Sequence, residues 1–220
     1  MYVYAFFKPI APLELPAGIV GVVQTIGNGY VSALVEPDLN WETLQADDQR
    51  LMQAVLVYDR AICTLFAQTI VLPLRFGTQF ASAGSLLAHL NSNQAHYSDA
   101  LTQLTGKAEY TLKLSSHELA SGDLPMPAKG RDYFLAKKQL YQAQVEQQQQ
   151  QTEQLQTLIE TIATDYTYIL SEATDGVQRI YVLSDRQPSS ALQTHFTAWQ
   201  SYCAQWTLEL SEPLPPYHFV

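Results

Sequence analysis

The side chains that could perform acid–base or metal chemistry are scattered along this 220-residue chain. His89 and His96 stand seven residues apart on one face of a predicted helix, and Asp99 follows them. Zinc ligands on a single helix are usually three or four residues apart, so this spacing favours a polar helix surface over a metal site. His117 and His195 are isolated. We therefore predict no metal ligands and no catalytic histidine.

Motifs that bind cofactors or activate a nucleophile are also missing from the sequence. Residues 27–29 (GNG) lack the later glycine and the helix start of a dinucleotide-binding loop, and no G-x-S-x-G elbow occurs. Cys63 and Cys203 lie far apart in apolar helical patterns, which favours small buried side chains over a disulfide or a catalytic thiol. We predict no catalytic residues, no cofactor and no enzymatic activity.

Arg75 is the most unusual charge, because it stands between Leu74 and Phe76 in an apolar run that ends at Gly77. A guanidinium in such a run would be partly buried and would need several acceptors. We predict an internal clamp that pairs with a helix carboxylate or with carbonyls at a strand end. The alternative is an interface anchor, since arginine is enriched among binding hot spots.

The last eight residues, 213–220 (PLPPYHFV), contain too many prolines for a helix and should begin as polyproline II. Pro215 and Pro216 restrict the backbone, so Tyr217 and Phe219 can dock with little loss of conformational entropy. We predict that this tail docks on its own protein at the junction of two domains, with His218 packed or hydrogen bonded. The alternative is that the tail reaches a partner.

The first half of the chain mixes strands and helices. Residues 27–29 predict a hairpin turn, because glycine tolerates positive φ. The proline at position 73 indicates either an edge strand or a strand end. Apolar residues at three- and four-residue spacing indicate helices, the first capped by Asn40 and the second ended by Gly106. The predicted strands are residues 2–7, 20–26, 30–35 and 71–77, and the predicted helices are 40–66 and 85–104.

The second half follows the order strand, helix, strand, strand, helix, strand, which is typical of a ferredoxin-like βαββαβ unit. In the first strand, even-numbered positions from Ala108 to Leu114 are apolar and should face the core, while Lys107, Glu109, Thr111 and Lys113 should face outward. Residues 121–130 predict a loop. The predicted strands are 107–115, 167–172, 177–184 and 206–210. The predicted core is Tyr110, Leu112, Leu114, Tyr181, Leu183, Phe196 and Trp199.

A long helix over about residues 131–165 is the most unusual predicted element. Two heptad series run along it and indicate a narrow seam, as in a coiled coil or helical hairpin. Polar residues 147–151, all glutamine, interrupt the seam, so we expect a solvated helix that projects from its domain; a low-complexity hinge is the alternative. The series are Phe134, Tyr141, Gln148, Leu155 and Ile162, and Val145, Thr152, Ile159 and Tyr166.

Composition limits the partners. Residues classed as hydrophobic make up 47% of the chain, which is sufficient for real cores. The formal net charge of −9 argues against nucleic acid or anionic membrane as a partner, and no segment is apolar enough to span a bilayer. The apolar start reads as a strand and not as a signal peptide, so we expect a cytoplasmic protein.

We therefore predict an α+β fold of two domains: residues 1–106, and a ferredoxin-like domain 107–212 with a long projecting helix or helical hairpin. A Pro/aromatic tail, 213–220, follows.

Several segments resemble one known family. Residues 71–78 (VLPLRFGT) are similar to the signature of the gas vesicle proteins GvpF and GvpL, and residues 215–219 (PPYHF) resemble that family's terminal motif. Weaker similarities, in the same order as in the family, lie at residues 2–4, 106–113 and 130–134. Together these segments span nearly the whole chain.

The resemblance implies a non-enzymatic accessory protein of the gas vesicle, needed for assembly. Such a protein is either a minor shell component or a factor that binds the main shell subunit GvpA and other accessory proteins. The first alternative is a dimeric coiled-coil adaptor, and the second is a small-ligand enzyme of ferredoxin-like fold. The predicted structural or interface residues are Arg75, Phe76, Gly77, Pro215, Pro216, Tyr217 and Phe219.

Overall fold

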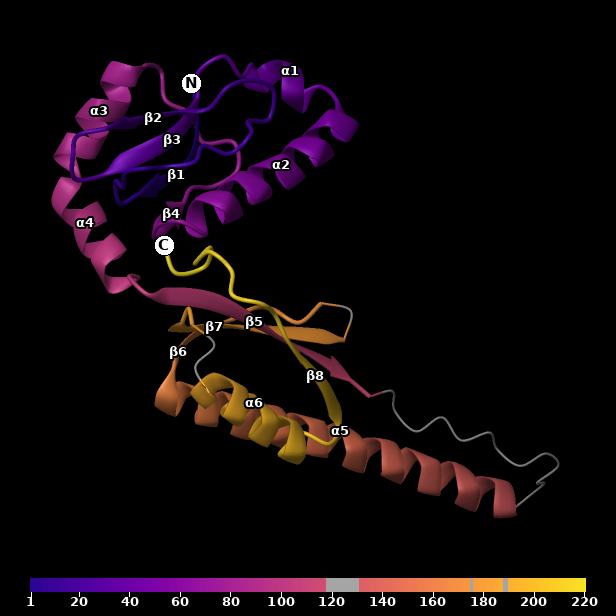
Figure 1. Cartoon of the computed structure of the whole chain (residues 1–220). Helices are drawn as coiled ribbons and strands as arrows, with labels where there is room; N and C mark the ends of the chain where they lie inside the picture. The colour runs from indigo at the N-terminus through magenta and orange to yellow at the C-terminus, as the bar shows by residue number, and fades with distance from the viewer. Residues whose placement is uncertain (118–130, 175, 188–189) are drawn as a thin grey trace. The chain divides into compact units, whose positions relative to one another are not determined.

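The computed structural model describes residues 1–117, 131–174, 176–187 and 190–220. This part of the chain is a mixed α/β structure with six helices and two four-stranded antiparallel sheets (Figure 1). It divides into two compact units: Met1–Glu109 together with Pro213–Val220, and Tyr110–Glu212. The predicted loop at 121–130 lies outside the described residues.

The first unit contains a sheet with the strand order β2-β3-β1-β4. All six residues of the central strand β1 are buried, which places side chains of both faces in the core. The predicted hairpin is confirmed: β2 pairs antiparallel with β3, and Gly29 in the turn has a φ of 88°. The strands are β1 (Tyr2–Phe7), β2 (Gln24–Gly27), β3 (Ser32–Glu36) and β4 (Val71–Pro73).

Strand β4 lies at the sheet edge, as its proline predicts. The two predicted long helices of this unit are each broken in two. Asp47 caps the second helix by accepting hydrogen bonds from the backbone nitrogens of Gln49 and Arg50, and Asn93 ends the third. The four helices are α1 (Trp41–Gln45), α2 (Asp48–Phe66), α3 (Ala83–Ser92) and α4 (Gln94–Gln103).

The second unit contains a sheet with the strand order β6-β7-β5-β8, and Figure 1 shows α5 and α6 side by side along it. The first residues of β5 belong to the first unit, since the division falls after Glu109. The elements are β5 (Lys107–Ser116), α5 (Arg131–Asp165), β6 (Thr167–Leu170), β7 (Val177–Asp185), α6 (Ser190–Tyr202) and β8 (Trp206–Leu210).

The core of the second unit agrees with the predicted one on β5 and α6 but not on β7. Tyr110, Leu112, Leu114 and Trp199 are buried as predicted, and Phe196 is half-buried. On β7 the predicted residues Tyr181 and Leu183 are only half-buried, whereas Ile180 and Val182 are fully buried. Both faces of β7 carry apolar residues, so alternation along the strand did not reveal which face points inward.

The predicted heptad seam of α5 is wrong for the first half of the helix and agrees with burial only near its end. Phe134 and Tyr141 are 70% and 67% exposed, whereas Ile162 is fully buried. Gln151 and Leu158, which belong to neither predicted series, are buried as well. Two glutamines of α5, the last of the run and one beyond it, hydrogen bond to backbone groups of their own unit. Gln151 donates to the carbonyl of His117 at 3.0 Å, and Gln154 accepts from the Gln205 backbone nitrogen at 2.9 Å.

Cys203 is buried, as predicted, whereas Cys63 is only half-buried; both are free thiols. Burial raises the pKa of the Cys203 thiol to about 11, and it also raises the pKa of the half-buried Cys63. A raised pKa leaves less thiolate, the reactive form, at any pH below it.

We therefore expect iodoacetamide at pH 8 to alkylate Cys203 about a hundredfold more slowly in the native protein than in denaturant, from thiolate content alone. Mass spectrometry of timed aliquots measures both rates. Equal rates would show that the thiol is accessible and would contradict the observed burial.

Candidate functional site: an aromatic groove

The turn that follows β4 is held by three backbone acceptors. The Leu74 nitrogen donates to the Tyr4 carbonyl at 3.0 Å, and the Tyr58 hydroxyl donates to the Leu74 carbonyl. The backbone nitrogen and the hydroxyl of Thr78 both donate to the Arg75 carbonyl, at 3.0 and 2.6 Å. The backbone at Arg75 is therefore fixed from both sides.

Phe76 and Gly77 face the core of the first unit. The Phe76 ring packs edge-on against Trp41 and Tyr58, with centroids 5.1 and 5.2 Å apart. Gly77 has a φ of 92°, and a Cβ there would lie 2.8 Å from the Trp41 ring. Both the left-handed backbone and the close ring require glycine at this position.

Replacing Gly77 with alanine should lower the free energy of unfolding by about 2 kcal/mol or more, from the strained φ and the clash with Trp41. The matched control is Gly84→Ala in α3, where the nearest atom is 3.7 Å from the new Cβ and φ is ordinary. That control should be neutral or slightly stabilising. Denaturant titration measures both, and equal midpoints for the two variants would contradict the role of Gly77.

Arg75 itself is exposed, so the predicted buried clamp is wrong. Within the described residues its side chain makes no hydrogen bond or ion pair. In the turn after β4 the Phe76 ring packs on aromatic neighbours, whereas the Arg75 side chain is exposed to solvent. The carboxylate clamp of this unit is Glu36 instead.

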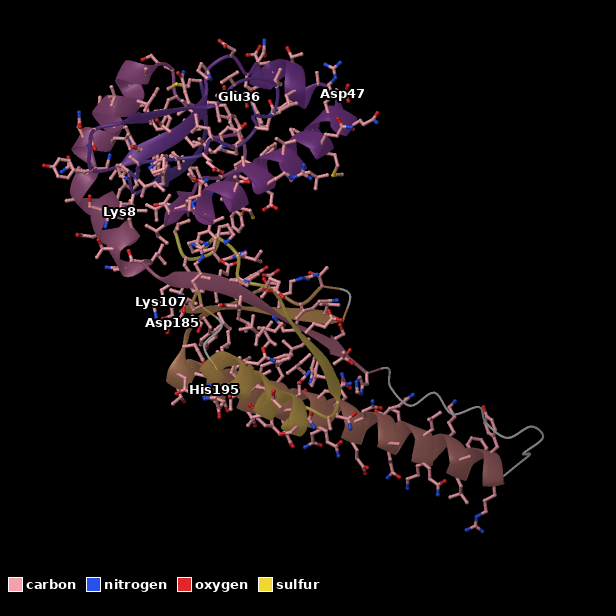
Figure 2. The ribbon with its side chains drawn as sticks, viewed as in Figure 1. Lys8, Glu36, Asp47, Lys107, Asp185 and His195 are labelled. Atoms are coloured by element: carbon pink, nitrogen blue, oxygen red, sulfur yellow. The ribbon has the colours of Figure 1, made fainter. Side chains whose placement is uncertain are left out.

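Glu36 is 1% exposed, and Figure 2 labels it within the first unit. Its carboxylate accepts from the Tyr4 hydroxyl and from the backbone nitrogens of Ile19 and Val20, the latter two at 2.8 Å. Gly21 also donates its backbone nitrogen to this carboxylate. These bonds hold residues 19–21, which is why the predicted strand at 20–26 begins only at Gln24.

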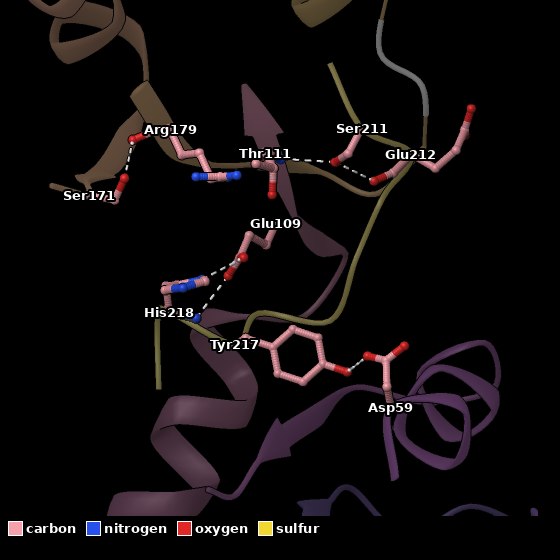
Figure 3. Close-up of polar contacts among 9 residues, drawn as sticks. All are labelled: Asp59, Glu109, Thr111, Ser171, Arg179, Ser211, Glu212, Tyr217 and His218. Atoms are coloured by element: carbon pink, nitrogen blue, oxygen red, sulfur yellow. Dashed lines mark hydrogen bonds and ion pairs between the residues drawn. The ribbon is translucent and has the colours of Figure 1, made fainter. Parts of the chain in front are cut away.

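The C-terminal tail docks on its own chain, as predicted, and belongs to the first unit. Pro215 and Pro216 are buried. The Tyr217 hydroxyl donates to Asp59 Oδ1 at 2.6 Å (Figure 3). The backbone nitrogens of Glu109 and Leu214 each donate to the other's carbonyl, at 2.9 and 2.8 Å.

Glu109 fixes the tail further. It is 1% exposed, which corrects its predicted outward position, because the tail covers that face of β5. Its carboxylate accepts from the His218 backbone nitrogen at 2.8 Å and lies 2.7 Å from His218 Nδ1 (Figure 3). The predicted hydrogen bonding of His218 is confirmed.

The turn after β4 and the tail meet at one cavity of about 800 Å³. Of the predicted site residues, Arg75, Phe76, Tyr217 and Phe219 line it directly. Gly77 gives the turn its left-handed backbone, and Pro215 and Pro216 are buried residues of the tail. We call this cavity the aromatic groove. Its lining residues are Phe6, Tyr58, Leu72, Pro73, Leu74, Arg75, Phe76, His96, Tyr97, Ala100, Gln103, Tyr217, His218, Phe219 and Val220.

Sequence reasoning missed the contributions of Tyr58, His96 and Tyr97 to this groove. Burial raises the pKa of Tyr58 well above its ordinary value, and burial together with the hydrogen bond to Asp59 does the same for Tyr217. Both hydroxyls are therefore neutral at physiological pH. The groove combines neutral aromatic rings and aliphatic side chains with the exposed guanidinium of Arg75, a composition suited to binding.

Two of the other histidines lie within hydrogen-bonding distance of tyrosine hydroxyls. His89 Nε2 lies 2.7 Å from the Tyr97 hydroxyl. His195 Nδ1 lies 2.9 Å from the Tyr166 hydroxyl and 3.8 Å from the carboxylate of Asp165. In the part of the chain that the structure describes, no group of three His, Cys, Asp or Glu residues is placed to hold a metal ion. Among the described helices, none has the length and hydropathy of a membrane span.

A mixed α/β fold that presents aromatic rings around an exposed arginine has the kind of surface through which proteins bind other proteins. The chain belongs to the family described as gas vesicle synthesis protein GvpL/GvpF, whose sequence profile matches residues 1–220. The resemblance carried by the two motifs is thus confirmed, and the chain is a gas vesicle-related protein.

Two solved structures share its fold. Gas vesicle protein GvpF from Anabaena sp. PCC7120 matches with a TM-score of 0.70 and 17% identity, over 99% of this chain and 94% of that one. GvpF from Microcystis aeruginosa matches with a TM-score of 0.69 and 17% identity, over 99% of this chain and 97% of that one. Among curated protein sequences, none matches this chain.

Proposed function

We propose that this chain is an accessory protein needed for gas vesicle assembly, which binds the main shell subunit GvpA and other accessory proteins, or is a minor component of the shell. Family membership over residues 1–220 supports a gas vesicle role. The aromatic groove supports a binding role, because it joins the two most specific family motifs, which are about 140 residues apart in sequence. This convergence is the observation that carries the proposal.

The two compact units are proposed to be two domains, residues 1–106 and 107–212, with the tail 213–220 docked on the first. The strand order β6-β7-β5-β8 and the succession β5-α5-β6-β7-α6-β8 support a ferredoxin-like second domain. The exposure of Phe134 and Tyr141 supports a projecting first half of α5. We place the protein at the gas vesicle, in the cytoplasm.

Co-expression with tagged GvpA tests the binding role. We expect this chain to co-purify with GvpA, and Arg75→Ala and Phe219→Ala to reduce the amount recovered by about tenfold, as hot-spot truncation does. Arg50→Ala, an exposed arginine in the first turn of α2, is the control and should bind normally.

Because Arg75 is exposed, Arg75→Ala should change the free energy of unfolding by no more than about 0.5 kcal/mol. Loss of co-purification at unchanged stability would assign Arg75 to the interface. A wild-type chain that never co-purifies with GvpA would exclude direct binding to that subunit.

A further inference from the structure

We infer that the aromatic groove binds an apolar segment of a partner protein that carries one aspartate or glutamate side chain, whose carboxylate pairs with Arg75. This inference rests on the proposed binding function and specifies the chemistry of the partner at the same groove. It makes no assumption about which gas vesicle protein supplies the segment.

The charge of the groove is the first argument. The chain carries 21 acidic residues and a formal net charge of −9, yet no Asp or Glu is among the described residues that line the groove. Arg75 stands there exposed, while the neighbouring His218 is already held by Glu109. The described lining therefore offers Arg75 no Asp or Glu side chain, on a protein that is acidic overall.

Desolvation is the second argument. An exposed guanidinium is hydrated, and a partner that covers the groove removes this water. The covered cation then needs an acceptor, and a carboxylate can bind a guanidinium with two parallel hydrogen bonds. Since no Asp or Glu side chain lines the groove and Arg75 has no ion pair within the described residues, we expect the partner to bring the carboxylate.

The size and lining of the groove define the rest of the segment. A cavity of about 800 Å³ accommodates several side chains. Leu74, Phe76 and Phe219 supply aliphatic and aromatic surface beside Arg75. Nucleic acid does not fit, because phosphate binding uses clusters of cations and this groove has a single arginine.

The test pans a phage-displayed library of random seven-residue peptides against the full chain, with counter-selection on Arg75→Ala. Peptides enriched for apolar residues around one Asp or Glu are expected. A representative peptide and its Asp→Asn or Glu→Gln form are then titrated against wild type, Arg75→Ala and the control Arg50→Ala.

We expect each single change, in the peptide or at Arg75, to weaken binding about tenfold, and the two together to weaken it hardly further. Phe219→Ala, a second groove variant, should also weaken binding. Selected peptides without acidic residues, or acidic peptides that bind Arg75→Ala as tightly as wild type, would overturn the inference. So would a selection that enriches no groove-dependent peptide.

Self-association of the full chain that disappears in Arg75→Ala would identify a second copy as the occupant and would also overturn it. The peptide experiment is independent of co-purification with GvpA. Acidic apolar peptides that bind through Arg75 would sustain the inference even where GvpA fails to bind. If the chain binds GvpA but the peptide change and the Arg75 change act independently, only the proposed function is supported.

Discussion

Replacing Glu36 with glutamine should lower the free energy of unfolding by roughly 3 kcal/mol, because the buried carboxylate accepts several charge-assisted hydrogen bonds at once. Its donors are the Tyr4 hydroxyl and the backbone nitrogens of residues 19–21. An amide of the same shape presents an NH₂ group to one side of this donor set. At least one donor then loses its acceptor and faces another donor.

Calorimetry and denaturant titration measure the loss, and hydrogen exchange should show faster exchange at residues 19–21. The matched control is Glu42→Gln in the first turn of α1, where the side chain is exposed. That control should change stability by no more than about 0.5 kcal/mol. An unchanged midpoint for Glu36→Gln would show that the carboxylate does not clamp the loop.

Deleting residues 215–220 should lower the free energy of unfolding by about 2–4 kcal/mol. The deletion removes two buried prolines and the Tyr217 and Phe219 rings from the first unit. It also leaves the carboxylate of Glu109, which is 1% exposed in the intact protein, without the two donors of His218.

Thermal unfolding compares the truncated chain with one that lacks only Val220, which is 56% exposed and should unfold at the wild-type temperature. A double-mutant cycle of His218→Ala and Glu109→Gln then separates the contribution of the His218–Glu109 pair from that of the Tyr217 and Phe219 rings. The double variant should lose less free energy of unfolding than the two single variants lose in sum. A truncated chain of unchanged stability would show that the tail contributes binding surface alone.

The sequence by itself determined most of the elements of this protein, because the signals for them are local. The alternation of apolar and polar residues predicted β5. The proline at position 73 predicted a sheet edge or a strand end, and β4 is an edge strand that ends at this proline. The motifs at residues 71–78 and 215–219 identified the family and, with it, four residues that line the groove.

The tertiary structure alone decided how the charged side chains and the amphipathic faces are used. The sequence predicts a partly buried Arg75, which is exposed, and an outward-facing Glu109, which is buried beneath the tail. Gln151 of α5 is buried, whereas Phe134 and Tyr141 are exposed.

In each case the deciding neighbour is distant in sequence. His218 lies 109 residues from Glu109, and Gln205 lies 51 residues from Gln154. The spacing of apolar residues in the sequence assigns each residue to one face of a strand or helix. Whether that face is buried depends on which distant segments of the chain pack against it.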